Sequence, residues 1–304
     1  VIAYNADLLR LAGFNPPAND WTFDELMEMA LVVASGRENT YGFNYAGYGL
    51  GLLYAGRGIS WQGFQDDPLN YFDSPAMAAF LSWLKEMIAE GALVPPEVDG
   101  MDELNLLRSG KVAFWVTQAG TNGLFLSADD PYQASFEVGF APIPSMLAGS
   151  ELVRRAPTMG LFISNSTPEA RACWDWIKYF SENAHVLNGI PARRSVAESS
   201  NWAARLGADE VEVYRITMEQ LTPYERWPSR SILNRPLYAW HGDAVSSVLE
   251  GTDIVTTLMT AHQKAETYLA CIGPAKEAEL SLSAEELSSE ASRCATVSDP
   301  SRDW

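Results

Sequence analysis

The chain has 304 residues, of which 47% are apolar and 20% are charged, so it is long enough for two globular domains of ordinary composition. Its formal net charge of −18 argues against nucleic-acid binding, because contacts with phosphate require patches of Lys and Arg. No apolar run approaches the roughly 18 residues that cross a membrane, and no signal peptide is visible.

The first 110 residues read as one short strand followed by helices. A strand over residues 1–5 enters a brief helix that Gly13 closes. The capping box Thr22-x-x-Glu25 predicts the start of a second helix, which ends near Gly36. Residues 41–60 are rich in Tyr and Gly but lack the spacing of a dinucleotide-binding loop. Further helices are expected over residues 50–55, 75–90 and 102–109.

The rest of the chain alternates strands with helices and then becomes mainly helical. Strands are expected over residues 111–116, 136–141 and 159–164, and a polar loop at 117–123 follows the first of them. Helices are expected over residues 168–182, 208–220, 235–250 and 253–271. Residues 273–304 are polar and contain a second capping box, Ser283-x-x-Glu286, and we expect a loosely attached tail.

The three cysteines show no spacing typical of zinc sites. Cys173 lies on an apolar helix stripe and is expected to be a buried thiol. Cys271 and Cys294 lie outside the periodic core pattern, so they either form a disulfide that pins the tail, which would indicate an oxidising compartment, or stay reduced. The sequence leaves both options open.

No reactive centre is apparent. The three histidines, His185, His241 and His262, have no metal-ligand spacing and are expected at helix surfaces or ends. There is no nucleophile elbow and no Walker loop. The acidic doublets fall in loops or at caps, where paired carboxylates are usually solvated. We therefore expect no catalytic residue, no metal and no cofactor.

Aromatic and amide side chains at strand and helix ends suit sugar binding, because rings cover the C–H face of a pyranose and polar groups pair with its hydroxyls. The aromatic candidates are Tyr48, Trp61, Trp227, Tyr238 and Trp240. The polar candidates are Gln118, Asn122 and Arg230. Each of these residues has a plain alternative, as a core residue or as a surface residue.

The order of several short motifs resembles the family 1 extracellular solute-binding proteins of ABC importers, the maltose-binding-protein-like group. The motifs are Ala3-Tyr4-Asn5-x-Asp7-Leu8 with Ala12-Gly13, Trp21-x-x-Asp24-Glu25-Leu26, Tyr41-Gly42-Phe43, Ser109-Gly110-Lys111-Val112-Ala113-Phe114, Gly160-Leu161-Phe162-Ile163-Ser164, Ala172-x-Trp174-x-x-Ile177, Gly189-x-Pro191-x-Arg193 and Gly251-x-Asp253. Each is weak alone, and the specificity comes from their shared order over residues 1–271.

The resemblance implies an α/β fold of the periplasmic-binding-protein-like class II, with two lobes joined by a hinge and the ligand between them. Residues 1–143 would belong to the second lobe and 144–198 to the returning portion of the first lobe. Residues 199–272 would supply helices of the second lobe, and 273–304 the polar C-terminal tail.

The resemblance also carries Tyr48, the loop with Gln118 and Asn122, and Tyr238 into the ligand cleft, whereas Trp61, Trp227 and Trp240 are proposed from chemistry alone. Members of the family begin with a signal peptide and roughly a hundred residues that have no match here. We therefore expect an N-terminally truncated sequence with an incomplete first lobe, in which residues 159–164 and 168–182 leave apolar faces exposed.

We expect a non-enzymatic, monomeric substrate-binding component of an ABC importer that binds a sugar or oligosaccharide and delivers it to the permease subunits by hinge closure. Its place would be the periplasm or the cell surface, and the sequence leaves lipid anchoring open. Three alternatives stay open: the same fold binding a polyol phosphate, a polyamine or a metal complex; a carbohydrate-active hydrolase; and an interaction module that binds no small molecule.

Overall fold

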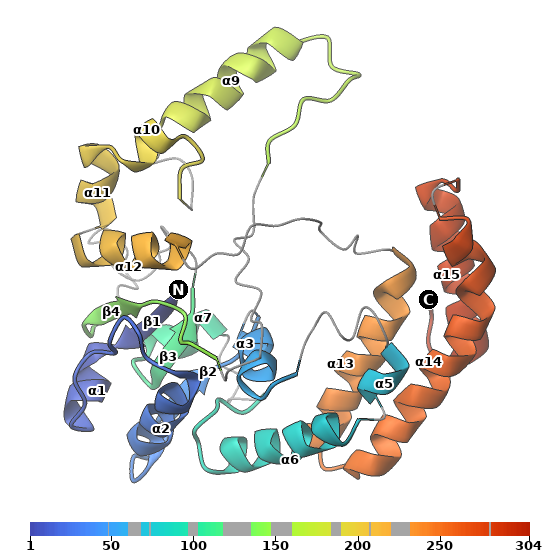
Figure 1. Cartoon of the computed structure of the whole chain (residues 1–304), viewed down its shortest axis with the longest axis horizontal. Helices are drawn as coiled ribbons and strands as arrows, with labels where there is room; N and C mark the ends of the chain where they lie inside the picture. Colours follow the sequence, from blue (N-terminus) through green and yellow to red (C-terminus); the bar gives the residue numbers. More distant parts are fainter. Residues whose placement is uncertain are drawn as a thin grey trace. The chain divides into compact units, whose positions relative to one another are not determined.

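A computed structural model describes most of the chain (Figure 1). The described residues are 1–47, 49–59, 68–72, 74–96, 103–117, 135–146, 160–183, 190–206, 208–219, 232–279 and 281–304. The chain divides into two compact units. Unit 1 comprises Val1–Leu52, Glu90–Leu147 and Leu152–Thr222, and unit 2 comprises Leu53–Ala89, Ala148–Glu151 and Pro223–Trp304.

A four-stranded sheet in the order β2-β3-β1-β4 organises unit 1. Strand β1 (Ile2–Asn5) pairs antiparallel with both β3 (Val112–Val116) and β4 (Val138–Ala141), and β2 (Tyr41–Asn44) pairs parallel with β3. All four residues of β1 are buried, as expected for the apolar inner strand of a sheet. The strands predicted over residues 1–5, 111–116 and 136–141 are confirmed.

Helices α1 (Ala6–Leu11) and α2 (Phe23–Ala34) follow the start of the sheet, and both begin at capping side chains. Asn5 accepts hydrogen bonds from the backbone N–H groups of Asp7 and Leu8 at the start of α1, and the predicted box between Thr22 and Glu25 is present at α2. Before α2, the indole of Trp21 donates to the carbonyl oxygen of Pro142 at 2.8 Å. This bond ties the entry of α2 to the segment after β4.

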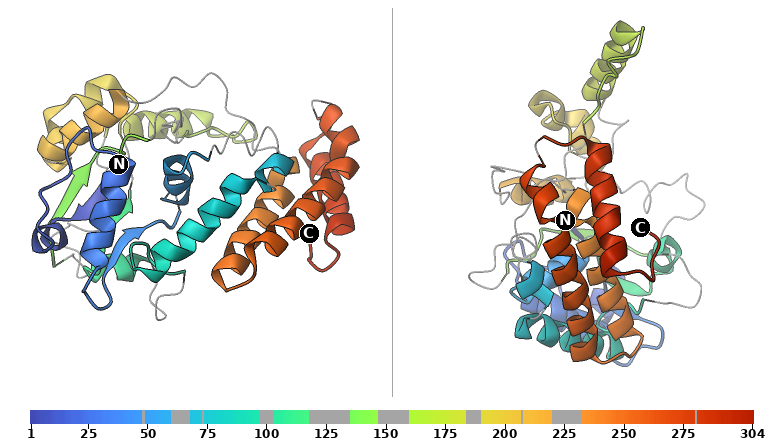
Figure 2. Two further views of the ribbon diagram at one scale, coloured as in Figure 1. Left: turned by 60° about the horizontal axis from the view of Figure 1, so that its bottom comes forward. Right: turned by 90° about the vertical axis from the view of Figure 1, so that its right-hand side faces the viewer.

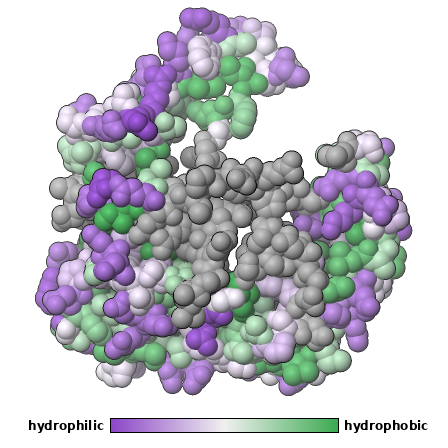
Figure 3. All heavy atoms as spheres, viewed as in Figure 1, coloured by the Kyte–Doolittle hydropathy of each residue, from purple (hydrophilic) through white to green (hydrophobic). Residues whose placement is uncertain are grey.

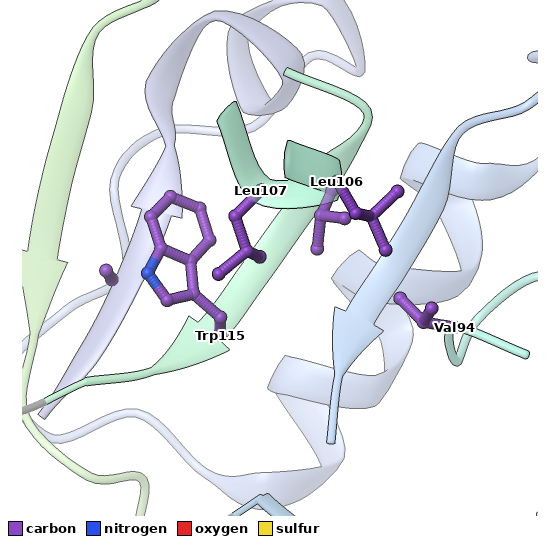
Figure 4. Packing of buried hydrophobic residues seen from close by; sticks show 6 residues of the cluster. Val94, Leu106, Leu107 and Trp115 are labelled. Atoms are coloured by element: carbon purple, nitrogen blue, oxygen red, sulfur yellow. The ribbon is translucent and has the colours of Figure 1, made fainter. Parts of the chain in front are cut away.

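The close-up in Figure 4 shows how β3 packs against α7 (Glu103–Arg108). Trp115 projects from β3 toward Leu107, and Leu106 and Val94 continue the same buried cluster. Near them the chain leaves no room at Gly42, where an added Cβ would lie 2.5 Å from the carbonyl oxygens of Ala30 and Ala92. The backbones of β2 and α2 therefore approach each other as closely as only glycine allows.

Residues 160–206 follow the sequence expectation only in part. Helix α9 (Ala170–Glu182) forms, but none of its residues is buried, and residues 160–163 are irregular rather than a strand. The strand prediction is wrong because a strand needs a neighbouring backbone for its hydrogen bonds, and among the described residues none pairs with this segment. Phe162 is 91% exposed, and Figure 3 shows hydrophobic residues along one side of α9.

The exposure of α9 also corrects the expectation for Cys173, whose thiol is half-buried and reduced rather than fully buried. The apolar surface predicted for this region is confirmed, because Trp174, Trp176 and Tyr179 are each about half exposed or more. Three helices follow α9, namely α10 (Arg194–Ala197), α11 (Ser200–Leu206) and α12 (Ala208–Glu219). Trp202 of α11 packs against Tyr214 of α12.

Unit 2 is built from helices. Helix α3 (Gly49–Gly56) contains the boundary between the units, and α5 (Pro68–Phe72) and α6 (Pro75–Ala89) follow it. The short 3-10 helix η2 (Ile232–Asn234) leads into α13 (Arg235–Leu249), which is followed by α14 (Ile254–Glu277) and α15 (Ala284–Ser298). Figure 2 shows the last three helices packed side by side.

The C-terminal segment 273–304 is not the loosely attached tail that its polarity predicted. The predicted box between Ser283 and Glu286 is present and starts α15, whose inner face is buried on α14. Cys271 and Cys294 form a disulfide with a Cα–Cα distance of 5.6 Å. The segment looked polar because only one stripe of α15, namely Ala291, Cys294 and Ala295, is buried. The lobe boundaries taken from the family resemblance stay predictions.

Candidate functional site

The residues proposed to hold a ligand fall mostly outside the described part of the chain. Tyr48, Trp61, Gln118, Asn122, Trp227 and Arg230 lie outside the described residues. Tyr238 and Trp240, both in α13, are described. The candidate site is therefore built from α13 and from the elements of unit 2 that pack on it.

Tyr238 and Trp240 have different surroundings, although they are two residues apart. Tyr238 is half-buried in the first turns of α13. Trp240 is 1% exposed, donates its indole N–H to Oδ2 of Asp299 at 3.1 Å and packs edge-on against Tyr268 and Trp304. A ring so enclosed offers no face to a ligand, so the role predicted for Trp240 does not fit its place in the core of unit 2.

A buried polar cluster lies on the same helix as Tyr238. His241 is 5% exposed, and its Nε2 is 2.9 Å from the hydroxyl oxygen of Tyr54 in α3. The rings of Tyr71 and Phe72 in α5 lie 5.5 and 6.3 Å from the imidazole. The expectation of a surface or helix-end histidine is wrong for His241, because polar side chains are buried when other side chains satisfy them.

Burial controls the protonation of this cluster. It lowers the pKa of His241 to about 4, so the imidazole is neutral at neutral pH. The pKa of Tyr71 is raised, first by burial and then by its neighbour Tyr54. The cluster is therefore uncharged over the physiological range, and it acts through hydrogen bonds and ring contacts.

His262, in α14, reaches the same region from another side. Its Nδ1 lies 3.2 Å from the carbonyl oxygen of Leu69 in α5, and the side chain is partly buried. Helix α5 follows directly on the segment that contains Trp61. Histidines from α13 and α14 thus both contact this short helix.

Asp299 anchors the C-terminal residues to α13 and α14. Its carboxylate accepts hydrogen bonds from Trp240, from Lys264 at 2.8 Å and from Ser301 at 2.6 Å. Burial alone would raise the pKa of Asp299, but these three bonds outweigh it and lower the pKa to about 2. Asp299 is therefore ionised at neutral pH although it is only 4% exposed.

Two further features lie apart from the predicted residues. An open groove of about 640 Å³ runs between α6 and the start of α14, lined by Ala78, Ser82, Lys85 and the turn at Gly251–Val255. It contains none of the candidate ligand residues. In unit 1, burial raises the pKa of Glu210 to about 7, a shift that a hydrogen bond with Tyr214 partly opposes.

Within the described ranges, no group of three or more His, Cys, Asp or Glu side chains could hold a metal ion, and no helix is long and apolar enough to cross a membrane.

Comparison with known families decides the class of this fold. Residues 1–186 match the family described as bacterial extracellular solute-binding protein. The chain belongs to this family. Its mixed α/β fold and its motif order agree with the membership, and the family resemblance expected from the sequence is confirmed. No curated protein sequence matches the chain.

Several solved structures of solute-binding proteins share the fold. Maltose-bound MalE3 of T. maritima is 20% identical with a TM-score of 0.57, and the match covers 87% of this chain and 69% of that one. UgpB of Mycobacterium tuberculosis in complex with glycerophosphocholine is 18% identical, with a TM-score of 0.59 and coverage of 87% and 67%. A solute-binding protein of Agrobacterium vitis with bound D-mannitol is also 18% identical, with a TM-score of 0.56 and coverage of 87% and 69%.

Proposed function

We propose that this solute-binding protein is the substrate-binding component of an ABC importer and that its ligand is a sugar, an oligosaccharide or a related polyol. The family match over residues 1–186 carries the proposal. Similar structures described with maltose and D-mannitol support the ligand class. The half-buried ring of Tyr238 supplies an aromatic surface of the kind that covers the C–H face of a sugar.

The remaining contacts would come from Tyr48, Trp61, Gln118, Asn122, Trp227 and Arg230. The protein would act as a monomer outside the cytoplasm and deliver its ligand to the permease subunits. The family description places its members outside the cell, and the disulfide between Cys271 and Cys294 suits an oxidising compartment.

Titration calorimetry of the chain against maltose, D-mannitol, glycerophosphocholine and spermidine tests the proposal. We expect heat of binding with maltose or D-mannitol. We also expect Tyr238→Ala to weaken that binding by about three- to tenfold, the value of one ring contact. Tyr179→Ala removes an exposed tyrosine of α9 that is not among the candidates, and it should bind as the wild type does. Binding of spermidine alone, or of none of the four, would refute the ligand class.

A polyol phosphate is the second candidate, favoured by the similarity to UgpB in complex with glycerophosphocholine. Arg230 would then pair with the phosphate, because guanidinium groups match its geometry. Heat of binding with glycerophosphocholine but not with maltose or D-mannitol would select this candidate. The hydrolase alternative is tested separately: it requires release of reducing ends from maltose oligomers, and we expect none.

A further inference from the structure

The buried pair formed by Tyr54 and His241 joins the helix that carries Tyr238 to the helix that follows Tyr48. Tyr54 is 1% exposed in α3, and its ring lies 4.4 Å from that of Phe80 in α6. Its hydroxyl oxygen lies 2.9 Å from Nε2 of His241 in α13. Both partners belong to unit 2, where the bond is enclosed by aromatic side chains.

The bond is well suited to fixing a position. A tyrosine hydroxyl both donates and accepts, so either tautomer of a neutral imidazole can complete it. The ring of Tyr71 lies 5.5 Å from the imidazole, and its side chain is neutral as well. A neutral bond that is buried among ring side chains is costly to leave unmade, so it holds α13 against α3.

The start of α13 depends on such contacts. Asn234, its N-cap residue, provides no side-chain hydrogen bond to the free N–H groups of the first turn. The turn before it is held from α14, where the hydroxyl of Tyr268 donates to the carbonyl oxygen of Leu233 at 2.6 Å. His241 lies three residues after Tyr238, so the two side chains are neighbours along one side of the helix.

We propose that the hydrogen bond between Tyr54 and His241 positions Tyr238 for ligand binding, an inference that rests on the proposed function. Tyr54 and His241 are positioning residues that act through Tyr238. The same bond ties α13 to α3 and, through the ring contacts with Tyr71, to α5.

Tyr54→Phe tests the proposal, because it removes the hydroxyl and keeps the ring that packs on Phe80. The matched control is Ser283→Ala, which removes the capping bond between Ser283 and Glu286 at α15 and lowers stability while both partners of the Tyr54–His241 bond are kept. The affinity of both variants is measured by calorimetry with maltose or D-mannitol, whichever the wild type binds. Tyr238→Ala and the double variant Tyr54→Phe/Tyr238→Ala complete a cycle. Amide hydrogen exchange over residues 235–241 is followed without ligand.

Tyr54→Phe is expected to raise the dissociation constant about two- to fivefold, less than removal of the Tyr238 ring does, while Ser283→Ala leaves it unchanged. In the Tyr238→Ala background, Tyr54→Phe should have no further effect, because its action passes through Tyr238. Exchange over residues 235–241 should become faster in Tyr54→Phe only. Unchanged affinity of Tyr54→Phe, or effects that multiply in the double variant, would overturn the proposal.

Failure of the wild type to bind either compound would count against the proposed function instead. In that case, amide exchange without ligand tests whether the Tyr54–His241 bond fixes the start of α13. Faster exchange over residues 235–241 in Tyr54→Phe than in Ser283→Ala supports the role, and equal exchange in the two variants overturns it.

Discussion

Replacing Asp299 with alanine tests how firmly the C-terminal residues hold unit 2 together. The change removes the acceptor of three hydrogen bonds, from Trp240, Lys264 and Ser301. The free-energy cost of losing the acceptor differs among the three donors. Trp240 is 1% exposed and cannot find water for its indole N–H, whereas the side chain of Lys264 is 30% exposed and can be rehydrated.

The lost bonds set the cost of the substitution. A buried donor left without its acceptor costs about 1–3 kcal/mol, and the charge-assisted bond with Lys264 adds a further 1–2 kcal/mol, so a loss of about 3 kcal/mol is expected. The same three bonds lower the pKa of Asp299 from 3.8 to about 2, which corresponds to roughly 2 kcal/mol of stabilisation by the ionised carboxylate after the cost of burial.

Thermal unfolding followed by calorimetry measures the loss. At pH 7 about 3 kcal/mol corresponds to a fall in Tm of roughly 6–12 °C. The folded-state pKa is the lower one, so the contribution of Asp299 is complete above pH 3.8 and disappears as the pH falls through 2. Asp243→Ala, which removes a half-exposed carboxylate paired with Arg302, should change stability by less than about 1 kcal/mol. If Asp299→Ala lowers Tm no more than Asp243→Ala does, Asp299 does not hold the C-terminal residues in place.

Three other predictions follow from the fold. Replacing both Cys271 and Cys294 with serine should lower the free energy of unfolding by about 3 kcal/mol, because the disulfide closes a loop with a sequence separation of 23 residues. Thiol titration of the denatured, unreduced wild type should count Cys173 alone, and a count of three thiols would contradict the disulfide. The pKa of His241 is about 4 in the folded state and 6.5 ordinarily, so unfolding takes up a proton, and the free energy of unfolding falls by about 3 kcal/mol as the pH drops from 6.5 to 4. A His241→Gln variant should lose this slope in plots of Tm against pH, and an unchanged slope would refute the assignment to His241. Gly42→Ala should lower the free energy of unfolding by about 2 kcal/mol or more, because the new Cβ meets two carbonyl oxygens at 2.5 Å. Gly51→Ala, whose Cβ would have nothing within 4 Å, should be neutral or stabilising in the same unfolding assay.

The sequence predicted the elements well where local signals decide the structure. The two capping boxes, at Thr22 and at Ser283, start α2 and α15 as expected, since the reciprocal bonds involve only residues three apart. The apolar runs of β1, β3 and β4 also appear as strands. These features need no knowledge of distant contacts.

Features that depend on distant partners could not be predicted in this way. The burial of His241 depends on Tyr54, which lies 187 positions away in the sequence. The firm attachment of α15 depends on Asp299 meeting Trp240 and Lys264 from other helices. Residues 160–163 have apolar strand composition, but composition cannot supply the neighbouring backbone that a strand requires.

The candidate site was predicted from residue chemistry, and chemistry alone does not separate a ligand contact from a core residue. Trp240 and Tyr238 look equivalent in the sequence, yet the first is enclosed and the second is half-buried. The helical period could have separated them. Trp240, Ala244 and Val248 form one buried stripe of α13, and Tyr238 lies off that stripe.

The central place of β1 has a consequence for biosynthesis. This strand precedes both of its neighbours in the sheet, which begin only at Val112 and Val138. A ribosome must therefore add more than a hundred residues before Ile2–Asn5 can find either partner, and the apolar strand waits unpaired throughout that time. Nascent chains of this protein should accordingly depend on holding chaperones until β4 has emerged, and slowing translation upstream of β3 should lower the yield of folded protein.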